Sequence, residues 1–416
     1  MNKFFFDHPE LPLLSDKDLS EVPIVRKYRA LFKNLDLSAI PTHNEGVGCS
    51  GYSNHSIIKA LIVKSLERIP SVPELIWRLA NQPYLSKYIL GFKSGIPEET
   101  KFYRFLKTFP YSKIDALIAS VNTKTLEELA IPIKTVSIDS KPIKANTKEN
   151  NPKHFQHNLS DKTKKPKRNQ QATWGHFSTT SDINGFKKKL FFWGYRIHLI
   201  WGGDKEVQLP LVAKLYPNNV PDEHVAPTLF NKLKRNYHIK KADKIKLLGD
   251  KKYDCWNVYE TFHRLFNGKA IIPTNTRNSK NTPLAVPTCQ AGHSMTYHST
   301  WYEPKGHRQR FKFVCPHNAK NNADDCIFRK TTYGCTKYLQ IKDTIPGKVY
   351  AHEDLFTKLY PKRFGIEQYN ATLQHLGQET PNHFKRKSIE NTVLFTILGT
   401  ALVAAYHAKR SSEQDP

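Results

Sequence analysis

A chain of 416 residues with 39% apolar and 12% aromatic residues can bury one large core or two to three ordinary ones, which excludes an intrinsically disordered protein. Lys and Arg outnumber Asp and Glu by 64 to 37, so the net charge is +27 and the pI is near 9.7. Such a charge favours nucleic acid as the partner, although it names no reaction and a solvated basic surface would share it.

The sequence has no evident secretion or membrane signal. Its first residues include an Asp and a Glu, and no apolar stretch precedes a small-residue cleavage site, so we expect a cytoplasmic, nucleoid-associated protein. The longest nearly uncharged run, residues 392–406, is shorter than the ~20 residues that span a bilayer and contains Gly399. This run is typical of a buried helix, and we expect no membrane partner.

Residues 54–109 have the spacing of short amphipathic helices. Their apolar residues recur three and four positions apart, and Ser71 followed by Glu74 predicts the start of a new helix. We therefore expect residues 1–125 to form a helical N-terminal domain. It is either a plain bundle or one that also binds DNA phosphates through its basic side chains.

The pattern after residue 131 changes to alternating, β-branched runs that are typical of strands. The predicted strands are residues 134–139, 193–200, 207–216, 244–248 and 270–273. Helical patterns at residues 222–236 and 256–266 separate the later strands, and a hairpin turn is expected at residues 202–205. Three antiparallel strands followed by alternating helices and strands predict a mixed α/β sheet.

Two long polar segments interrupt this pattern. Residues 141–189 are heavily basic and are interpreted as a mobile arm between the first two strands, either a solvated loop or a segment that neutralises DNA phosphates. Residues 276–347 contain four of the six cysteines and many turn-forming residues, and they are interpreted as an insertion. The core is then expected to comprise residues 126–275 and 348–410.

Two aspartates follow apolar strand patterns. Asp139 and Asp250 are each predicted to lie at the end of a strand. The ends of strands are where α/β sheets bind ligands, and converging carboxylates are what hard divalent cations require. For either aspartate alone, a turn or helix cap would be the better interpretation. Near the C-terminus, Arg363 and Glu367 are four residues apart on a predicted helix, where a surface ion pair is the simplest alternative.

These motifs resemble those of DDE transposases from the large bacterial insertion-sequence group, which have a ribonuclease H-like catalytic core. Ile-Asp-Ser around Asp139 and Gly-Asp-Lys-Lys-Tyr-Asp around Asp250 resemble the sequences at the family's two catalytic aspartates. Tyr360, Arg363 and Glu367 have the spacing of its third motif. The lysine that the family places seven residues after the glutamate is replaced here by Gln374, which retains a hydrogen bond and loses the charge.

The resemblance extends over nearly the whole chain. Residues 54–109 resemble the family's N-terminal domain, and residues 172–175 and 194–198 resemble a segment on its second strand. It implies an α/β fold with a ribonuclease H-like mixed sheet, a helical N-terminal domain and a cysteine-containing insertion before the last catalytic helix.

The resemblance also implies a mechanism. Asp139, Asp250 and Glu367 would be catalytic and would hold two Mg²⁺ ions, for which Mn²⁺ could substitute. Water would free a 3′-hydroxyl at the end of the element, and that hydroxyl would attack target DNA in a cut-and-paste reaction. Tyr360, Arg363, Lys251 and Gln374 are the predicted DNA-binding residues. His198 and His224 stay outside the predicted catalytic set, because a lone histidine is more often structural.

The expected partner is therefore double-stranded DNA, both the terminal inverted repeats of an element and its target. Two ends must be cut together, so a homodimer on DNA is expected. A ribonuclease H-like nuclease without strand transfer and a catalytically inactive DNA-binding relic are the two alternatives.

The cysteines of the insertion allow a structural zinc site. Cys289, Cys315, Cys326 and Cys335 offer enough thiolates for one tetrahedral Zn²⁺, with His293 and His317 nearby. Their spacing is irregular and lacks a Cys-x-x-Cys pair, so buried or unligated thiols are the alternative.

Overall fold

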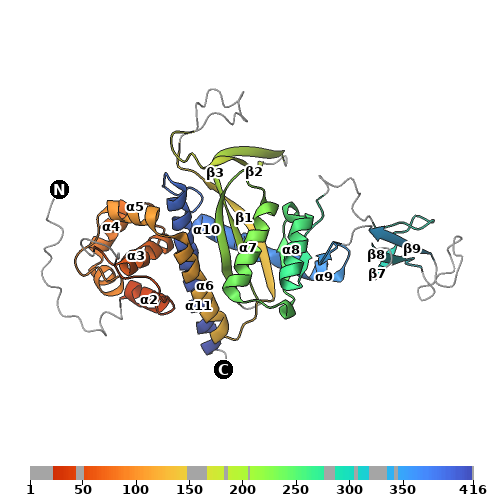
Figure 1. The fold of residues 1–416 in the computed structure, drawn as a ribbon, viewed down its shortest axis with the longest axis horizontal. Coiled ribbons are helices and arrows are strands. Elements are labelled where there is room, and N and C mark those ends of the chain that lie inside the picture. The colour runs from red at the N-terminus through yellow and green to blue at the C-terminus, as the bar shows by residue number, and fades with distance from the viewer. Residues whose placement is uncertain are drawn as a thin grey trace.

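The computed structural model describes residues 22–43, 51–147, 166–181, 186–204, 207–275, 286–303, 308–317, 335–341 and 345–414. In these ranges a helical N-terminal region is followed by a mixed α/β region, which is interrupted by a small separate sheet (Figure 1). The predicted mixed α/β architecture is confirmed, because the central sheet contains both parallel and antiparallel strand pairs.

Short helices build the N-terminal region, as their apolar spacing predicted. They are α2 (Pro23–Phe32), α3 (Asn54–Leu66), α4 (Val72–Asn81), the π-helix η2 (Tyr84–Ile89), α5 (Glu99–Thr108) and α6 (Tyr111–Glu128). The predicted helix start at Ser71 is confirmed, since its side chain accepts a 3.2 Å hydrogen bond from the Glu74 backbone N–H. The domain boundaries stay predictions. The predicted boundary at residue 125 lies within α6, which ends at Glu128.

The central sheet has seven strands, and β1 lies between its parallel part and its antiparallel part. The strands are β1 (Thr135–Lys144), β2 (Thr173–Ser181), β3 (Phe186–Gly203), β4 (Gln208–Pro217), β5 (Lys246–Gly249), β6 (Lys269–Ile271) and β10 (Lys348–Val349). Their order is β10-β6-β5-β1-β3-β2, and β4 pairs with β3. β1, β5, β6 and β10 run parallel, whereas β3 is antiparallel to β1, β2 and β4.

Helices cover both faces of this sheet. On one face lie α7 (Asp222–Tyr237) and α8 (Trp256–Phe266), which pack against Val136 and Ile138 of β1. On the other face lie α10 (Phe364–His375) and α11 (Arg386–Gln414), which share a core with Ile143 (Figure 1). Because strand residues alternate between faces, Asp139 faces the α10 layer together with Ile143.

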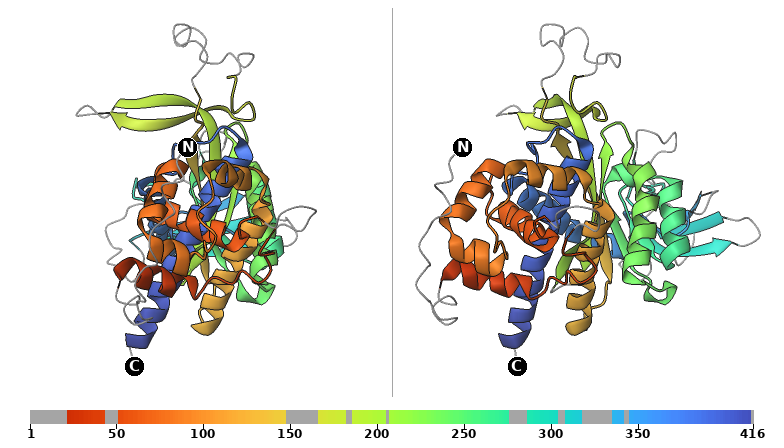
Figure 2. Two further views of the ribbon diagram at one scale, coloured as in Figure 1. Left: turned by 90° about the vertical axis from the view of Figure 1, so that its left-hand side faces the viewer. Right: turned by 60° about the vertical axis from the view of Figure 1, so that its left-hand side comes forward.

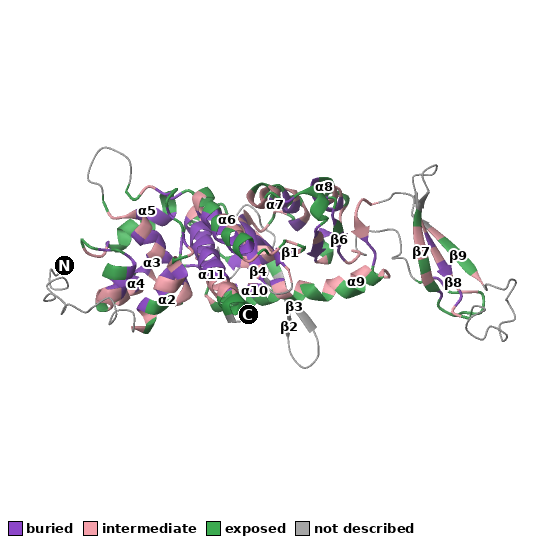
Figure 3. Ribbon diagram, turned by 90° about the horizontal axis from the view of Figure 1, so that it is seen from below, coloured by how far each residue is buried: buried purple, intermediate pink, exposed green. Residues whose placement is uncertain are grey.

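The long helix α11 is the predicted buried helix. It is long and apolar enough to cross a membrane by length and composition, but most of its apolar stretch is buried inside the molecule. Figure 3 shows it between α2, α3 and α5 on one side and α6 and the sheet on the other. Gly399 allows this close packing, because a Cβ there would lie 3.1 Å from the side chain of Leu66.

The predicted arm at residues 141–189 is partly wrong. β1 continues to Lys144, and residues 173–181 form β2, which pairs with the first half of β3 as a long antiparallel ribbon (Figure 2). The lysines at positions 187–189 hid the first half of β3, since a ribbon is held by backbone hydrogen bonds that need no apolar run. Residues 148–165, with the most basic part of the arm, lie outside the described residues.

Candidate active site

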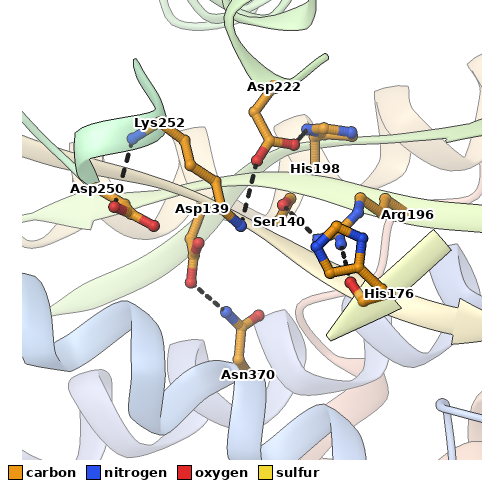
Figure 4. A network of polar contacts seen from close by, with 9 residues as sticks. All are labelled: Asp139, Ser140, His176, Arg196, His198, Asp222, Asp250, Lys252 and Asn370. Carbon is orange, nitrogen blue, oxygen red and sulfur yellow. Dashed lines mark hydrogen bonds and ion pairs between the residues drawn. The ribbon is translucent and has the colours of Figure 1, made fainter. Parts of the chain in front are cut away.

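Two aspartates lie side by side where the parallel pairing of β1 and β5 ends. Ile138 of β1 is paired with Gly249 of β5, so the next residues, Asp139 and Asp250, lie at the same level on adjacent strands (Figure 4). Gly249 permits this close packing, since a Cβ there would lie 3.3 Å from Ile272.

The two aspartates are positioned differently. Asp250 ends β5 as predicted and caps the short helix η5 (Lys251–Tyr253), where it accepts a 3.4 Å hydrogen bond from the Lys252 backbone N–H. The prediction that Asp139 ends its strand is wrong, because β1 runs on to Lys144 along β3. Pro142 is tolerated there because β5 has already ended and leaves that edge of β1 without a partner strand among the described residues.

The surroundings of Asp139 disfavour its charged form. Burial is the main cause that raises the pKa of Asp139, to about 6, and the negative charge of Asp250 raises it further. The Ser140 backbone N–H and the positive charges of Arg363 and Lys252 act in the opposite direction. The pair is thus a concentrated negative charge that its neighbours only partly compensate.

Helix α10 closes the site from the other side. Asn370 donates a 2.9 Å hydrogen bond from Nδ2 to Oδ2 of Asp139 (Figure 4). The predicted third carboxylate, Glu367, lies one turn earlier on the same helix, where its side chain is 44% exposed and forms an ion pair with Arg363. The helix therefore presents Asn370 directly to Asp139, while Glu367 is held at the rim by Arg363.

The remaining predicted DNA-binding residues lie in the segments that carry the acidic pair and Glu367. Tyr360, in the short helix η8 (Tyr360–Arg363), stacks on Phe356 of α9 (Asp354–Leu359), with ring centroids 4.9 Å apart. The Arg363 guanidinium lies 5.8 Å from the centre of the Tyr360 ring. Lys251 is exposed in η5, and Gln374 is exposed near the end of α10. Their DNA contacts stay predictions.

A second polar layer lies behind the aspartates, towards α7. The side chain of Asp222, at the start of α7, lies 3.6 Å from His198 of β3 and 3.9 Å from the Lys252 ammonium (Figure 4). His198 is fully buried, and burial lowers its pKa to about 4, so its ring is neutral at neutral pH. His224, by contrast, is exposed on α7.

Sequence patterns did not single out two residues near the pair. Asn370 is three residues after Glu367, so its presence on the same helix face could have been predicted from the helical period. Tyr253 belongs to the motif around Asp250, but no sequence pattern predicted its complete burial beside the pair. Burial, together with the charges of Asp222, Asp139 and Asp250, raises its pKa well above the usual value. Its neutral hydroxyl has no hydrogen-bond partner among the described residues.

Oxygen ligands at this site suit a hard divalent cation. Mg²⁺ is commonly held by only one or two carboxylates and keeps several waters, and the repulsion between Asp139 and Asp250 would be relieved by such a charge. No group of three or more His, Cys, Asp or Glu side chains in the described ranges is close enough to hold a metal. Glu367 would have to leave Arg363 to become a third ligand.

The cysteines of the insertion are only partly described. The strands β7 (Thr296–Glu303), β8 (Arg308–Val314) and β9 (Thr336–Ile341) form a three-stranded antiparallel sheet. Cys315 donates a 2.9 Å backbone hydrogen bond to Cys335, and Cys289 packs in the same small core. Cys326 lies outside the described residues, and the others form no metal-binding group within the described part. The zinc site stays a prediction.

Fold and site together define a mixed α/β protein with an acidic pair on adjacent parallel strands, covered by a helix that contacts the pair. No protein-family model matches the chain, and no curated protein does. Among solved structures, the chain is similar to a piggyBac transposase in a synaptic complex with hairpin DNA. The identity is 7% and the TM-score 0.41, over 94% of this chain and 76% of that chain. A likeness at this level carries no argument about function.

Proposed function

We propose that this chain is a DNA transposase of the DDE type, which cuts DNA at the ends of an insertion sequence and joins the freed 3′-hydroxyl to target DNA. The observation that carries the proposal is that Asp139 and Asp250 directly follow the last paired residues of β1 and β5, with the helix of Glu367 and Asn370 packed over them. The three motifs that resemble this family contain these two aspartates and Glu367.

The charge around the acidic pair supports a polyanionic substrate. Arg363, Lys251 and Lys252 lie in the segments that flank the pair, and the whole chain carries a net charge of +27. A phosphodiester approaching two carboxylates is repelled unless positive charge compensates both. The basic rim would draw in DNA, and Tyr360 would pack against the strand that is cut.

The chain's own residues have distinct parts in the proposed reaction. Asp139 and Asp250 would hold Mg²⁺ or Mn²⁺, and Glu367 would complete the set after it separates from Arg363. When bound, such cations stabilise the charge that develops on the phosphate during in-line displacement. Asn370 orients the Asp139 carboxylate through its hydrogen bond. Arg363, once separated from Glu367, would contact a DNA phosphate.

The proposed assembly is a homodimer on double-stranded DNA, since two ends must be cut in one event. The protein would act in the cytoplasm on chromosomal DNA. The homodimer is tested by the mass of the complex that forms on DNA, and the location by fractionating cells that express the protein.

The test is incubation of the purified protein with end-labelled DNA from the regions that flank its own coding sequence. The reaction is run with Mg²⁺ or with a chelator, beside an Asp250→Asn variant and a Glu127→Gln control, whose carboxylate is exposed on α6. We expect Mg²⁺-dependent nicking and joined products with the wild type and the control, and neither with Asp250→Asn.

Other results would replace the proposal. Nicking without joined products would assign a nuclease of the same fold. DNA binding without cleavage in any of the three proteins would leave a DNA-binding relic, for which Gln374 in place of the family's lysine would be a reason.

A further inference from the structure

A cavity of about 280 Å³ lies between the helical region and the loop that follows α10. Its wall on the helical side includes Lys64, Arg68 and Tyr103, and its wall on the loop side includes His375, Gln378 and His383. This cavity is separate from the acidic pair, because none of its lining residues belongs to β1, β5 or η5.

The cavity is positively charged. No Asp or Glu occurs among the described residues that line it. Lys64 donates a 2.8 Å hydrogen bond to the Ile69 carbonyl but has no carboxylate partner within the described ranges, and burial lowers its pKa to about 8. Burial and the charge of Lys64 also lower the pKa of His383 to about 4. An anion in the cavity would compensate the charge of this half-buried ammonium, and no described carboxylate does so.

Arg68 occupies a backbone position that favours glycine. It follows the end of α3 with φ of 53°, in the left-handed region where a side chain is strained. Its backbone N–H closes the helix onto the Ser65 carbonyl, and glycine would do the same with less strain. The fold alone therefore does not require this arginine, whose exposed side chain borders the cavity.

The cavity is held at a defined distance from the acidic pair. The Lys141 ammonium of β1 forms a 2.9 Å ion pair with Glu379 in the loop, and the Lys144 backbone N–H donates a 2.7 Å hydrogen bond to the Glu379 carbonyl. His375 is eight residues after Glu367 on α10. At 1.5 Å per residue, the cavity rim lies about 12 Å from Glu367 along the helix.

We propose that this cavity binds a backbone phosphate of a DNA strand that lies along α10. At about 3.4 Å of rise per nucleotide, this phosphate is about three or four nucleotides from the one nearest Glu367. Arg68 and Lys64 supply the charge, and the neutral His383 ring supplies a hydrogen bond. The inference rests on the proposed function for the nature of the strand, but the phosphate contact itself requires no cleavage.

The test uses the salt dependence of DNA binding, measured with the full chain and a short labelled duplex in chelator, so that no cleavage occurs. The variants are Lys64→Met, which keeps the apolar stem, and Arg68→Gly, which relieves the strained backbone. Lys33→Met is the control, because Lys33 is an exposed lysine at the end of α2 that does not line the cavity. Thermal unfolding of each variant checks the fold.

We expect each cavity variant to lower the slope of log K against log salt by about 0.9, the value for one lost phosphate contact on duplex DNA. Lys33→Met should change neither slope nor affinity, and Arg68→Gly should unfold at or above the wild-type temperature. A reduced slope in the cavity variants therefore supports the inference even if no cleavage is ever found.

Two results would overturn it. Slopes for Lys64→Met and Arg68→Gly that equal that of Lys33→Met would exclude a DNA phosphate in the cavity. Stabilisation by inorganic phosphate that is lost in Arg68→Gly, with an unchanged DNA slope, would assign the cavity to a free anion instead.

Discussion

Asn370 Nδ2 on α10 lies 2.9 Å from Oδ2 of Asp139 on β1, and the two residues are 231 positions apart in the chain. This hydrogen bond is a direct link between α10 and the acidic pair. It orients a carboxylate whose charged form is disfavoured by burial and by the negative charge of Asp250. Helix α10 therefore positions Asp139 as well as carrying Glu367.

Replacing Asn370 by Ala should slow DNA nicking more than it destabilises the fold. A hydrogen bond to a charged group contributes about 1.5–3 kcal/mol, so the rate should fall roughly 10- to 100-fold if the bond aligns Asp139 during the reaction. Gln368→Ala, at an exposed position on the same helix, should retain the wild-type rate. Single-turnover nicking measures both, and equal rates would show that Asn370 has no positioning role.

Divalent cations should stabilise the folded protein through the acidic pair. A ligand that binds only the folded state adds about 2.7 kcal/mol at a hundred times its Kd. We expect Mg²⁺ to raise the thermal unfolding temperature of the wild type and of Glu127→Gln, and to have little effect on Asp250→Asn. A shift of the same size in all three proteins would place the cation elsewhere.

Buried His198 should make the protein sensitive to mild acid. Its folded pKa is lowered from 6.5 to about 4, so between these values the unfolded chain binds more protons than the folded one. The contribution of His198 to the free energy of unfolding is therefore fully present above pH 6.5. It decreases by on the order of 3 kcal/mol as the pH falls towards 4.

Urea unfolding at a series of pH values measures this dependence. His198→Gln should lower the slope of stability against pH in this window, because the amide does not titrate. His224→Gln, at an exposed position, should retain the wild-type slope. Identical slopes in all three proteins would mean that His198 does not titrate as its burial indicates.

The ion pair between Lys348 and Asp254 should stabilise the edge of the sheet next to the site. The two side chains are only 5% and 11% exposed and lie 2.7 Å apart, and Asp254 also accepts hydrogen bonds from Tyr259 and Asn275. Lys348→Met would leave a buried carboxylate without its cation, which should cost about 3–5 kcal/mol.

A double-mutant cycle tests this pair by urea unfolding. Adding Asp254→Asn to Lys348→Met should recover part of the loss, since the buried charge is then gone. Strictly additive losses would show that the pair has no coupling energy.

Much of the fold could be predicted from the sequence because the relevant patterns are local. The apolar spacing in residues 54–66 and the cap at Ser71 involve side chains within one or two turns, and both are found in the structure. The strand before Asp250 could be predicted from its short apolar run. The sequence did not predict β2, because its pairing with β3 is made by backbone groups that any residues can supply.

The candidate site divides in the same way. The sequence by itself determined which side chains are available, including Asp139, Asp250, and Glu367 at a helical spacing from Arg363. Only the tertiary structure decided that the two aspartates lie level on adjacent strands, that Asn370 contacts Asp139, and that Lys64 and Arg68 border a cavity beside α10. The physical reason is distance along the chain. Such contacts join segments far apart in sequence, and the packing of helices on both faces of one sheet selects them, which no local pattern encodes.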